Sequence, residues 1–414
     1  MGPYTLGHTR LAIQDLTGAS HQPYLVGDIA VTYNGELWEP HPGLGDTPVV
    51  AHLLSLHGVA ALPMLHGMFA LAWSDGEHLW LARDTYGEVP LHWGWTAEQR
   101  IVYGSEIKAL LAHGALPHTI TWVEPGTWVR FGGPPTRVRW APPVLANQHP
   151  PGDLADLLTT GSVDRMTADV PVAVLASGGL DSSAILALLV DHGYRPTCYT
   201  AVYAPHTADL DYARKVSAHL GLDLVEVTVP DPTKDTIDDA IRATEMTFKA
   251  QIEIALGCLP LAQAIASDGF KVVLSGEGSD ELLGSYGWGY HGVQRQGWFG
   301  YRHDQFTRQH KKNFARTNKV FMAHGVEPRL PFLHDPYVRT VLGMDQDTIT
   351  GQGRHPKAVL AASVQHLLPD GMPWRLKHAF QTGAKIDRAT SKLIDDPTRY
   401  YHAEHLRIFG KVKP

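Results

Sequence analysis

Apolar and polar residues alternate in short runs along the first third of the chain, and this pattern predicts β-strands. Alternation with a period of two is typical of a strand with one buried face. Helical periods interrupt the runs at Val49–His57 and Glu106–Ala112. The mixture predicts a layered α/β sheet domain over residues 1–132. The runs are Ile29–Tyr33, Met68–Trp73, His78–Ala82, Arg100–Tyr103 and Thr127–Phe131.

Proline pairs mark the next twenty residues. They occur at Pro134-Pro135, Pro142-Pro143 and Pro150-Pro151. Paired prolines oppose helix and central strand and favour a stiff, extended connection. We therefore predict a linker over residues 133–152, followed by a second domain over residues 153–414.

The pattern changes beyond that boundary to apolar strands that are each followed by a helical period. Val170–Ala176 precedes the helical stretch Ser182–Asp191, and Gly269–Leu274 precedes Asp280–Leu283. Strand followed by helix, repeated, predicts parallel strands joined by crossover helices. The second domain is therefore expected to be a parallel-sheet α/β domain.

Composition narrows the class of protein. The chain has 414 residues, 44% hydrophobic and 19% charged, with a formal net charge of −7, which argues against a partner bound through a broad basic face, such as a nucleic acid. The short basic run His310-Lys311-Lys312 is interpreted as a solvated helix face. The first residues lack a signal pattern, and no apolar run approaches the roughly 18 to 20 residues of a membrane span. A cytoplasmic location with no membrane partner is expected.

The segment Ser177-Gly-Gly-Leu-Asp-Ser-Ser183 follows an apolar strand directly and opens a helix. Its glycines allow phosphate oxygens to approach the backbone, and its serine hydroxyls and the free N–H groups of the helix can donate hydrogen bonds. No Gly-Lys-Ser/Thr ends the loop, so it is not a Walker loop. Asp181 inside such a loop is explained by a magnesium ion that bridges to the phosphates. The alternative is a glycine turn in which Asp181 caps the helix.

This loop resembles the pyrophosphatase-type PP-loop of the asparagine synthetase and β-lactam synthetase superfamily. Leu274-Ser-Gly-Glu-Gly-Ser-Asp-Glu-Leu-Leu-Gly284 resembles the second signature of its synthetase domain. The resemblance implies ATP and Mg²⁺ as cofactors, with the metal on Asp181 and Asp280. The ATP and pyrophosphate contacts that it implies are Ser177, Gly178, Gly179, Leu180, Asp181, Ser182, Ser183, Val202, Ser275, Gly276, Glu277 and Gly278.

Two further matches imply catalytic residues. Glu245, in Ile241-Arg-Ala-Thr-Glu-Met246, resembles an acidic residue that can take a proton from the attacking amine. Lys377, in Trp374-Arg-Leu-Lys-His378, resembles a lysine that stabilises transition-state charge. A last match runs from Ala315 to Leu333, where the family usually has an aspartate next. This chain has His334 and then Asp335, so the local contacts there are expected to differ.

The first domain resembles the Ntn-type glutaminase half of the family, an α/β sandwich. The resemblance is carried by Gly7–Leu16, Tyr33–Glu36, Gly45–Thr47, Ala82–Gly87 and Tyr103–Lys108. It implies a glutamine site in which Arg10 holds the carboxylate, Glu36 and Asp46 hold the amino group, and Asn34 with Gly35 holds the oxyanion.

The glutaminase match lacks its nucleophile. That residue is a cysteine at the very amino terminus, assisted by the free amine, whereas position 2 here is Gly2 and the first strands of the domain also have no counterpart. The two cysteines, Cys198 and Cys258, lie in the other domain. We therefore expect a truncated domain with a vestigial glutamine site.

The resemblance implies amide formation through an acyl-adenylate with release of AMP and pyrophosphate. Aspartate or a related carboxylate is the expected substrate, and ammonia or an amine the nitrogen source. A ring-closing synthetase, such as a β-lactam synthetase or lasso-peptide cyclase, is the alternative, and a catalytically silent homologue is a third reading. The sequence leaves the oligomeric state open, with a homodimer as one assembly.

Overall fold

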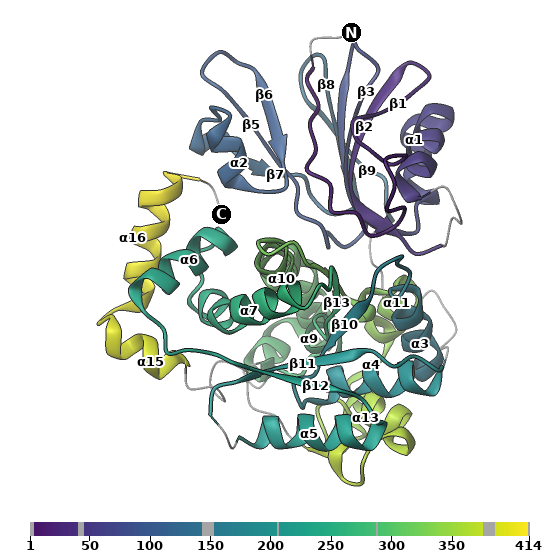
Figure 1. Ribbon diagram of the computed structural model, residues 1–414, viewed down its shortest axis with the longest axis vertical. Helices are drawn as coiled ribbons and strands as arrows, with labels where there is room; N and C mark the ends of the chain where they lie inside the picture. Colours follow the sequence, from purple (N-terminus) through teal and green to yellow (C-terminus); the bar gives the residue numbers. More distant parts are fainter. Residues whose placement is uncertain are drawn as a thin grey trace. The chain divides into compact units, whose positions relative to one another are not determined.

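The computed structural model describes residues 4–39, 45–142, 153–204, 207–286, 289–375 and 386–412. The chain forms two compact units (Figure 1). Unit 1 comprises residues 1–143, 167–170 and 402–414, and unit 2 comprises residues 144–166 and 171–401. The stretch expected to be a linker contains strand β9 (Thr136–Arg139), which pairs with its neighbour in unit 1.

Unit 1 is built on an antiparallel six-stranded sheet with the order β1-β2-β3-β4-β8-β9. A second sheet of three strands has the order β6-β5-β7. Each predicted strand and both predicted helices of this unit are present. The elements are β1 (Tyr24–Val26), β2 (Ile29–Leu37), α1 (Asp46–His57), η1 (Gly58–Met64), β3 (Gly67–Ser74), β4 (Leu79–Arg83), β5 (His92–Trp95), β6 (Ile101–Gly104), α2 (Ile107–Ala112), η2 (Pro117–Thr119), β7 (Thr121–Trp122) and β8 (Thr127–Phe131).

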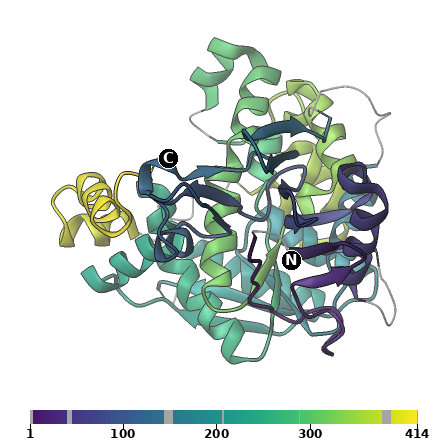
Figure 2. The same cartoon turned by 90° about the horizontal axis from the view of Figure 1, so that it is seen from above.

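Strand β3, in the middle of the large sheet, is buried on both faces. Phe69, Leu71 and Trp73 point to one face, into a core shared with α1 and η1. Met68, Ala70 and Ala72 point to the other face, into a core shared with the second sheet. Successive side chains of a strand alternate between faces, so a continuous apolar strand joins two cores. Figure 2 shows the purple helix α1 alongside the purple strands of this unit.

Unit 2 contains a fully parallel five-stranded sheet with the order β12-β11-β10-β13-β14. Helices α3, α4 and α5 lie on one side of it and helices α6, α7 and α10 on the other (Figure 1). This confirms the predicted parallel α/β domain. The strands are β10 (Val172–Leu175), β11 (Thr197–Val202), β12 (Leu224–Thr228), β13 (Val272–Leu274) and β14 (Glu327–Arg329).

The helices of unit 2 follow the crossover pattern. The chain leaves β10 for β11 and β12 on one side, then returns to β13 and β14 on the other. The strand order therefore reverses between β10 and β13, which is where open α/β sheets bind ligands. The helices are α3 (Leu154–Asp164), α4 (Leu180–Asp191), α5 (Ala208–Leu220), α6 (Lys234–Thr244), α7 (Lys249–Ser267), α8 (Ser279–Leu283), α9 (Gly289–Thr307), α10 (Asn313–Met322), α11 (Asp335–Gly343), α12 (Gln346–Thr350), α13 (Ala358–Val364) and α15 (Ile386–Leu393), with α16 (Pro397–Phe409) crossing the boundary between the units.

Two helical stretches reach the length and apolar character of a membrane span, which corrects the expectation that no run approaches this length. They are Asp46–Met64 and Lys249–Ser267, each of 19 residues with a mean hydropathy of 1.3. The second is α7, which contacts α6, α10 and β11 and buries Ile252, Ala255 and Ile265. A helix covered on several sides in a protein core acquires the same apolar composition.

Candidate active site

The predicted phosphate loop connects β10 to α4, at the carboxyl edge of the parallel sheet. Gly178 has a φ of +68°, and a Cβ there would lie 2.0 Å from the carbonyl oxygen of Asp209. Only glycine allows the first turn of α5 to approach so closely. Hydroxyls within the loop hold its shape, since the Ser177 amide donates to Ser182 Oγ (3.2 Å) and Ser183 Oγ donates to the Gly179 carbonyl (2.8 Å).

The second glycine-rich loop connects β13 to α8 and lies directly beside the first. A Cβ on Gly276 would be 3.1 Å from Asp181 Cβ and 3.2 Å from the Ser182 amide nitrogen. Gly278 has a φ of +96° and precedes the first residue of α8. The two loops predicted separately from the sequence thus meet at the point where the strand order reverses.

Three charged side chains converge on one point between these loops. Lys357 Nζ lies 2.7 Å from both carboxylate oxygens of Asp181 and 2.6 Å from Asp280 Oδ1. Ser279 Oγ also donates to Asp181 Oδ1 at 2.6 Å. Burial alone would lower the pKa of Lys357, but the two carboxylates outweigh it and raise that pKa above its ordinary value. A fixed positive charge therefore lies between the two predicted metal ligands.

This geometry fits a magnesium site that is completed by substrate. Asp181 and Asp280 already direct oxygens at a single cationic atom, and Mg²⁺ usually takes one or two protein carboxylates together with phosphate oxygens and water. Within the described ranges no group of three or more His, Cys, Asp or Glu side chains is arranged to hold a metal. The donor set therefore suits a metal that arrives with a nucleotide.

Glu277 is paired with Arg316 of α10 rather than directed at the lysine. Arg316 is 2% exposed and also donates to Gln251 Oε1 at 2.8 Å. Burial raises the pKa of Glu277, and the guanidinium opposes this rise. Glu281, one turn further on, accepts from Tyr286 Oη and Asn313 Nδ2 at 2.5 Å each. The second loop is thus tied to α10 through buried polar groups.

Arg375 supports the first loop from the opposite side. Its Nη1 donates to the Gly178 carbonyl at 3.0 Å, it pairs with Asp209, and its guanidinium lies 4.5 Å from the centre of the Tyr212 ring. Val202 ends β11, the neighbour of β10, so it lies at the same edge of the sheet as the loop. Leu180 is the first residue of α4 and is buried.

The two predicted catalytic residues have different outcomes. Glu245 ends α6 in a left-handed conformation (φ +58°) and is buried against Lys319 Nζ, 2.6 Å from its Oε2. Lys377 lies outside the described residues. His334, where the sequence departs from the family pattern, caps α11 and packs where Gly161 leaves room for it. Burial and then the nearby Arg165 lower the pKa of His334 to about 4.

The predicted glutamine-site residues lie in unit 1, where their polar groups form hydrogen bonds with other residues of the same unit. Arg10 donates to the carbonyls of Gln14 (3.2 Å), Thr17 (2.6 Å) and Asp15. Gln14 in turn donates to Glu36 Oε2 at 2.6 Å. Asn34 Nδ2 donates to Ser105 Oγ at 3.1 Å.

Gly35 and Asp46 complete this set. A Cβ on Gly35 would lie 2.1 Å from the Met68 carbonyl, so its lack of a side chain allows β2 and β3 to pair closely. Asp46 begins α1 and is 5% exposed. Burial raises the pKa of Asp46, against hydrogen bonds from Tyr33 and nearby backbone amides that lower it.

Three residues of the site were not predicted from the sequence, namely Lys357, Arg316 and Arg375. Lys357 lies in Arg354-His-Pro-Lys357, which carries no local signature. A charged residue is usually exposed, and only the folded chain brings this one to the two loops. Arg375 lies inside the quoted segment Trp374–His378, so its neighbourhood was identified but its own contacts were not.

Fold and site together define an α/β nucleotide-loop synthetase that carries an amidotransferase-like unit. The asparagine synthase family model matches residues 153–305 and 300–410, and the glutamine amidotransferase domain model matches residues 2–124. The chain is 31% identical to glutamine-hydrolyzing asparagine synthetase 3 of Arabidopsis thaliana, over 91% of this chain and 71% of that protein. It is 29% identical to the glutamine-hydrolyzing asparagine synthetase B of Escherichia coli K12, over 91% of this chain and 74% of that protein. The chain belongs to the asparagine synthetase family, a family of carbon–nitrogen ligases.

A solved structure is also similar in part. The glutamine phosphoribosylpyrophosphate amidotransferase of B. subtilis, complexed with ADP and GMP, matches with a TM-score of 0.24 and 17% identity, over 48% of this chain and 45% of that one.

Proposed function

We propose that this chain activates aspartate with ATP and converts it to asparagine. The observation that supports this proposal is the meeting of two glycine-rich loops around Asp181, Asp280 and Lys357. Such a set of groups suits the charged phosphates of a nucleotide. Family membership supports amide formation, and the names of the relatives suggest the amino acid.

In the first step, a carboxylate oxygen of aspartate attacks the α-phosphorus of ATP. The bond to the β-phosphate breaks, giving an acyl-adenylate and pyrophosphate. The amides and hydroxyls of the Ser177–Ser183 loop would hold the departing pyrophosphate, and Lys357 would supply positive charge to it. Bound at Asp181 and Asp280, Mg²⁺ would offset further phosphate charge.

In the second step, a nitrogen nucleophile attacks the acyl carbon and AMP leaves. Glu245 accepts the proton that the amine releases, and Lys377 stabilises the charge that develops. The ion pair with Lys319 keeps Glu245 in the carboxylate form, which is the form that can accept a proton, and the same cation weakens it as a base. Glu245→Gln is expected to retain ATP–pyrophosphate exchange and to lose amide formation by 10² or more. Equal losses in both reactions would remove Glu245 from the second step.

Free ammonia is the nitrogen source in this proposal. Burial raises the pKa of the Cys198 thiol to about 12 and that of the Cys258 thiol to about 11. A thiol must ionise to act as a nucleophile, so neither of these two thiols is prepared to hydrolyse glutamine near neutral pH. We place this activity in a soluble cytoplasmic enzyme.

The first experiment measures release of AMP and pyrophosphate from ATP with Mg²⁺ and aspartate. Separate reactions contain ammonium, glutamine or no nitrogen source. Release with ammonium and not with glutamine is the expected result. Release with glutamine would contradict the proposed nitrogen source. Absence of AMP and pyrophosphate release in all three reactions would contradict aspartate as the substrate. It would favour a ring-closing synthetase or a catalytically silent homologue.

A further inference from the structure

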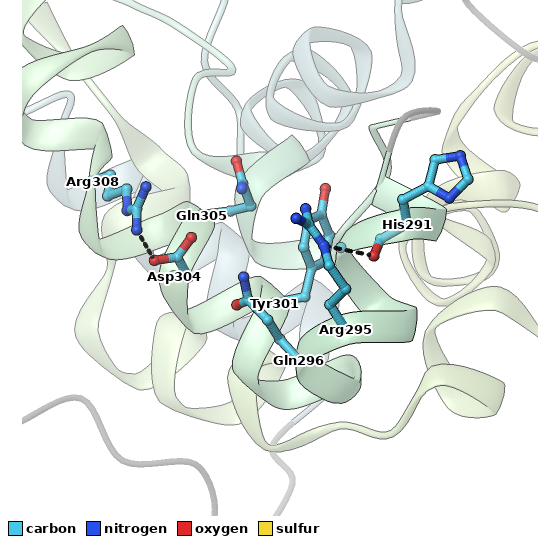
Figure 3. Close-up of a pocket in the computed structure, with 8 residues that line it drawn as sticks. His291, Arg295, Gln296, Tyr301, Asp304, Gln305 and Arg308 are labelled. Carbon is cyan, nitrogen blue, oxygen red and sulfur yellow. Dashed lines mark hydrogen bonds and ion pairs between the residues drawn. The ribbon is translucent and has the colours of Figure 1, made fainter.

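Helix α9 is bent sharply, and a cavity lies in the bend (Figure 3). Gly297 has φ +72° and ψ 169°, which no helix contains, so α9 consists of two arms joined at this glycine. The arms touch where Gly292 of the first meets Tyr301 of the second, because a Cβ on Gly292 would lie 2.4 Å from the tyrosine ring. The cavity has a volume of about 340 Å³.

Each arm contributes one face to this cavity. The first arm supplies His291, Gly292, Arg295 and Gln296, and the second supplies Tyr301, Asp304, Gln305 and Arg308. Residues three and four apart share a helix face, so the spacing of both sets directs them to one side. Figure 3 shows these side chains on the two sides of the bend.

The charges of the lining favour an anion. Arg308 pairs with Asp304 at 2.6 Å, and this aspartate is the only carboxylate among the lining residues. Arg295 donates to the carbonyl of His291 at 3.3 Å, which leaves its positive charge unneutralised by that contact. The basic run His310-Lys311-Lys312 begins two residues after Arg308. His310 of this run is buried, which corrects its interpretation as part of a solvated face.

We propose that the α9 bend is a binding site for a small anionic metabolite, with Arg295 on one arm and Arg308 on the other as the cations that attract it. Guanidinium groups bind carboxylates and phosphates through paired hydrogen bonds. The volume suits a molecule at the small end of the range for ligand pockets, which begins at about 300 Å³. Gln296 and Gln305 add amide groups that can orient its uncharged part.

The site has a physical connection to the second loop. Tyr301 forms the contact between the arms, and its chain neighbour Arg302 donates from Nε to the Leu282 carbonyl of α8 at 2.7 Å. Leu282 lies two residues after Asp280, which approaches Lys357. An anion that shifts Tyr301 therefore acts on α8, and we expect it to change the apparent KM for ATP. This last expectation rests on the proposed ATP-dependent function, whereas the binding site does not.

Binding is tested by calorimetric titration in EDTA without nucleotide, at constant ionic strength. Sodium phosphate and sodium pyrophosphate probe the phosphate class, and sodium aspartate and sodium citrate probe the carboxylate class. The protein is compared with Arg295→Gln, Arg308→Gln and the control Arg100→Gln, whose arginine pairs with Glu98 in unit 1. Any anion binding at the ATP loops is expected to be the same in all four proteins, so that only the α9 site distinguishes them.

At least one probe is expected to bind saturably and to lose about tenfold in affinity in each α9 variant, with no change in Arg100→Gln. Arg295 and Arg308 are exposed, and melting curves without anion verify that the variants fold. Absence of saturable binding, or equal binding in all four proteins, would overturn the site. An anion that binds without changing the apparent KM for ATP would overturn its connection to α8.

Discussion

The polar candidate residues of the two units differ in the partners that they contact. In unit 2, Asp181, Asp280 and Lys357 meet around one point between two glycine-rich loops. In unit 1, Arg10 is held by backbone carbonyls and Glu36 by the side chain of Gln14. A charge cluster between loops can exchange its partners for a ligand. A guanidinium that already bonds to three carbonyls supports its own loop.

The contrast shows that residues matched to a family motif can have very different partners in the folded chain. Both sets were recognised by their resemblance to family motifs, yet their partners in the folded chain differ. We infer that unit 2 is arranged for catalysis and that the matching residues of unit 1 stabilise the fold. The following substitutions test this difference.

The largest effect is expected at the two aspartates of unit 2. Asp181→Ala and Asp280→Ala should each lower aspartate-dependent AMP release by 10³ or more, because they remove the carboxylates proposed to hold Mg²⁺ against the phosphates. The control is Asp191→Ala, at the other end of helix α4, which should retain the rate. Near wild-type turnover in either loop variant would contradict the proposal that this aspartate holds Mg²⁺.

Lys357 gives the next largest effect. Lys357→Met leaves two carboxylates facing each other without a counter-charge, which should lower the free energy of unfolding by about 3 kcal/mol. Mg²⁺ should restore more stability to this variant than to the unmodified protein, since the ion neutralises the same carboxylates. Denaturant unfolding with and without Mg²⁺ measures both effects. Lys215→Met, on the exposed face of α5, serves as the control. If Mg²⁺ stabilised both variants equally, the ion would not bind where the Lys357 ammonium group lies, between Asp181 and Asp280.

Local signals in the sequence predicted much of the fold. Alternation identified β2, β3, β4, β6 and β8, and strand-to-loop-to-helix order placed Asp181 and Asp280 at the ends of parallel strands. The edge strand β9 was missed, since paired prolines around Thr136–Arg139 indicated a linker. An edge strand tolerates neighbouring prolines because one side of it needs no hydrogen-bond partner.

The site was predicted less completely, for a physical reason. Loop residues carry their chemistry within a few positions of one another, so Ser177 to Ser183 can be recognised locally. Lys357 lies 176 residues from Asp181 in the chain, and nothing near it marks its role. The hydrogen bonds from Arg10 to backbone carbonyls could not be predicted from the sequence either. A sequence motif gives the identity of the donor residue but not of the groups that accept from it.

His334 tests unit 2 away from the loops and with a smaller expected effect. Its pKa is lowered to about 4 by burial and Arg165, against about 6.5 in an unfolded chain. The unfolded state therefore binds more protons between these values, so stability is complete above pH 6.5 and falls as the pH drops toward 4. His334→Gln should remove on the order of 2 kcal/mol of this pH dependence. Unfolding at pH 7.5 and pH 5 measures it, with exposed His366→Gln as the control. An unchanged dependence of stability on pH in His334→Gln would contradict a neutral, half-buried imidazole at this position.

The smallest effect on turnover is expected at Arg10, where the comparison between the units is tested most directly. Arg10→Gln removes hydrogen bonds from a charged donor to backbone carbonyls, so it should lower the free energy of unfolding by about 2 kcal/mol. Ammonium-dependent turnover should stay within twofold of the original, because the residue holds no substrate in this interpretation. Exposed Arg100→Gln should change stability by no more than about 0.5 kcal/mol. If Arg10→Gln instead raised the KM for glutamine while leaving stability intact, the glutamine site would be functional. Arg10 would then bind substrate rather than stabilise the fold, and the inferred difference between the two units would be wrong.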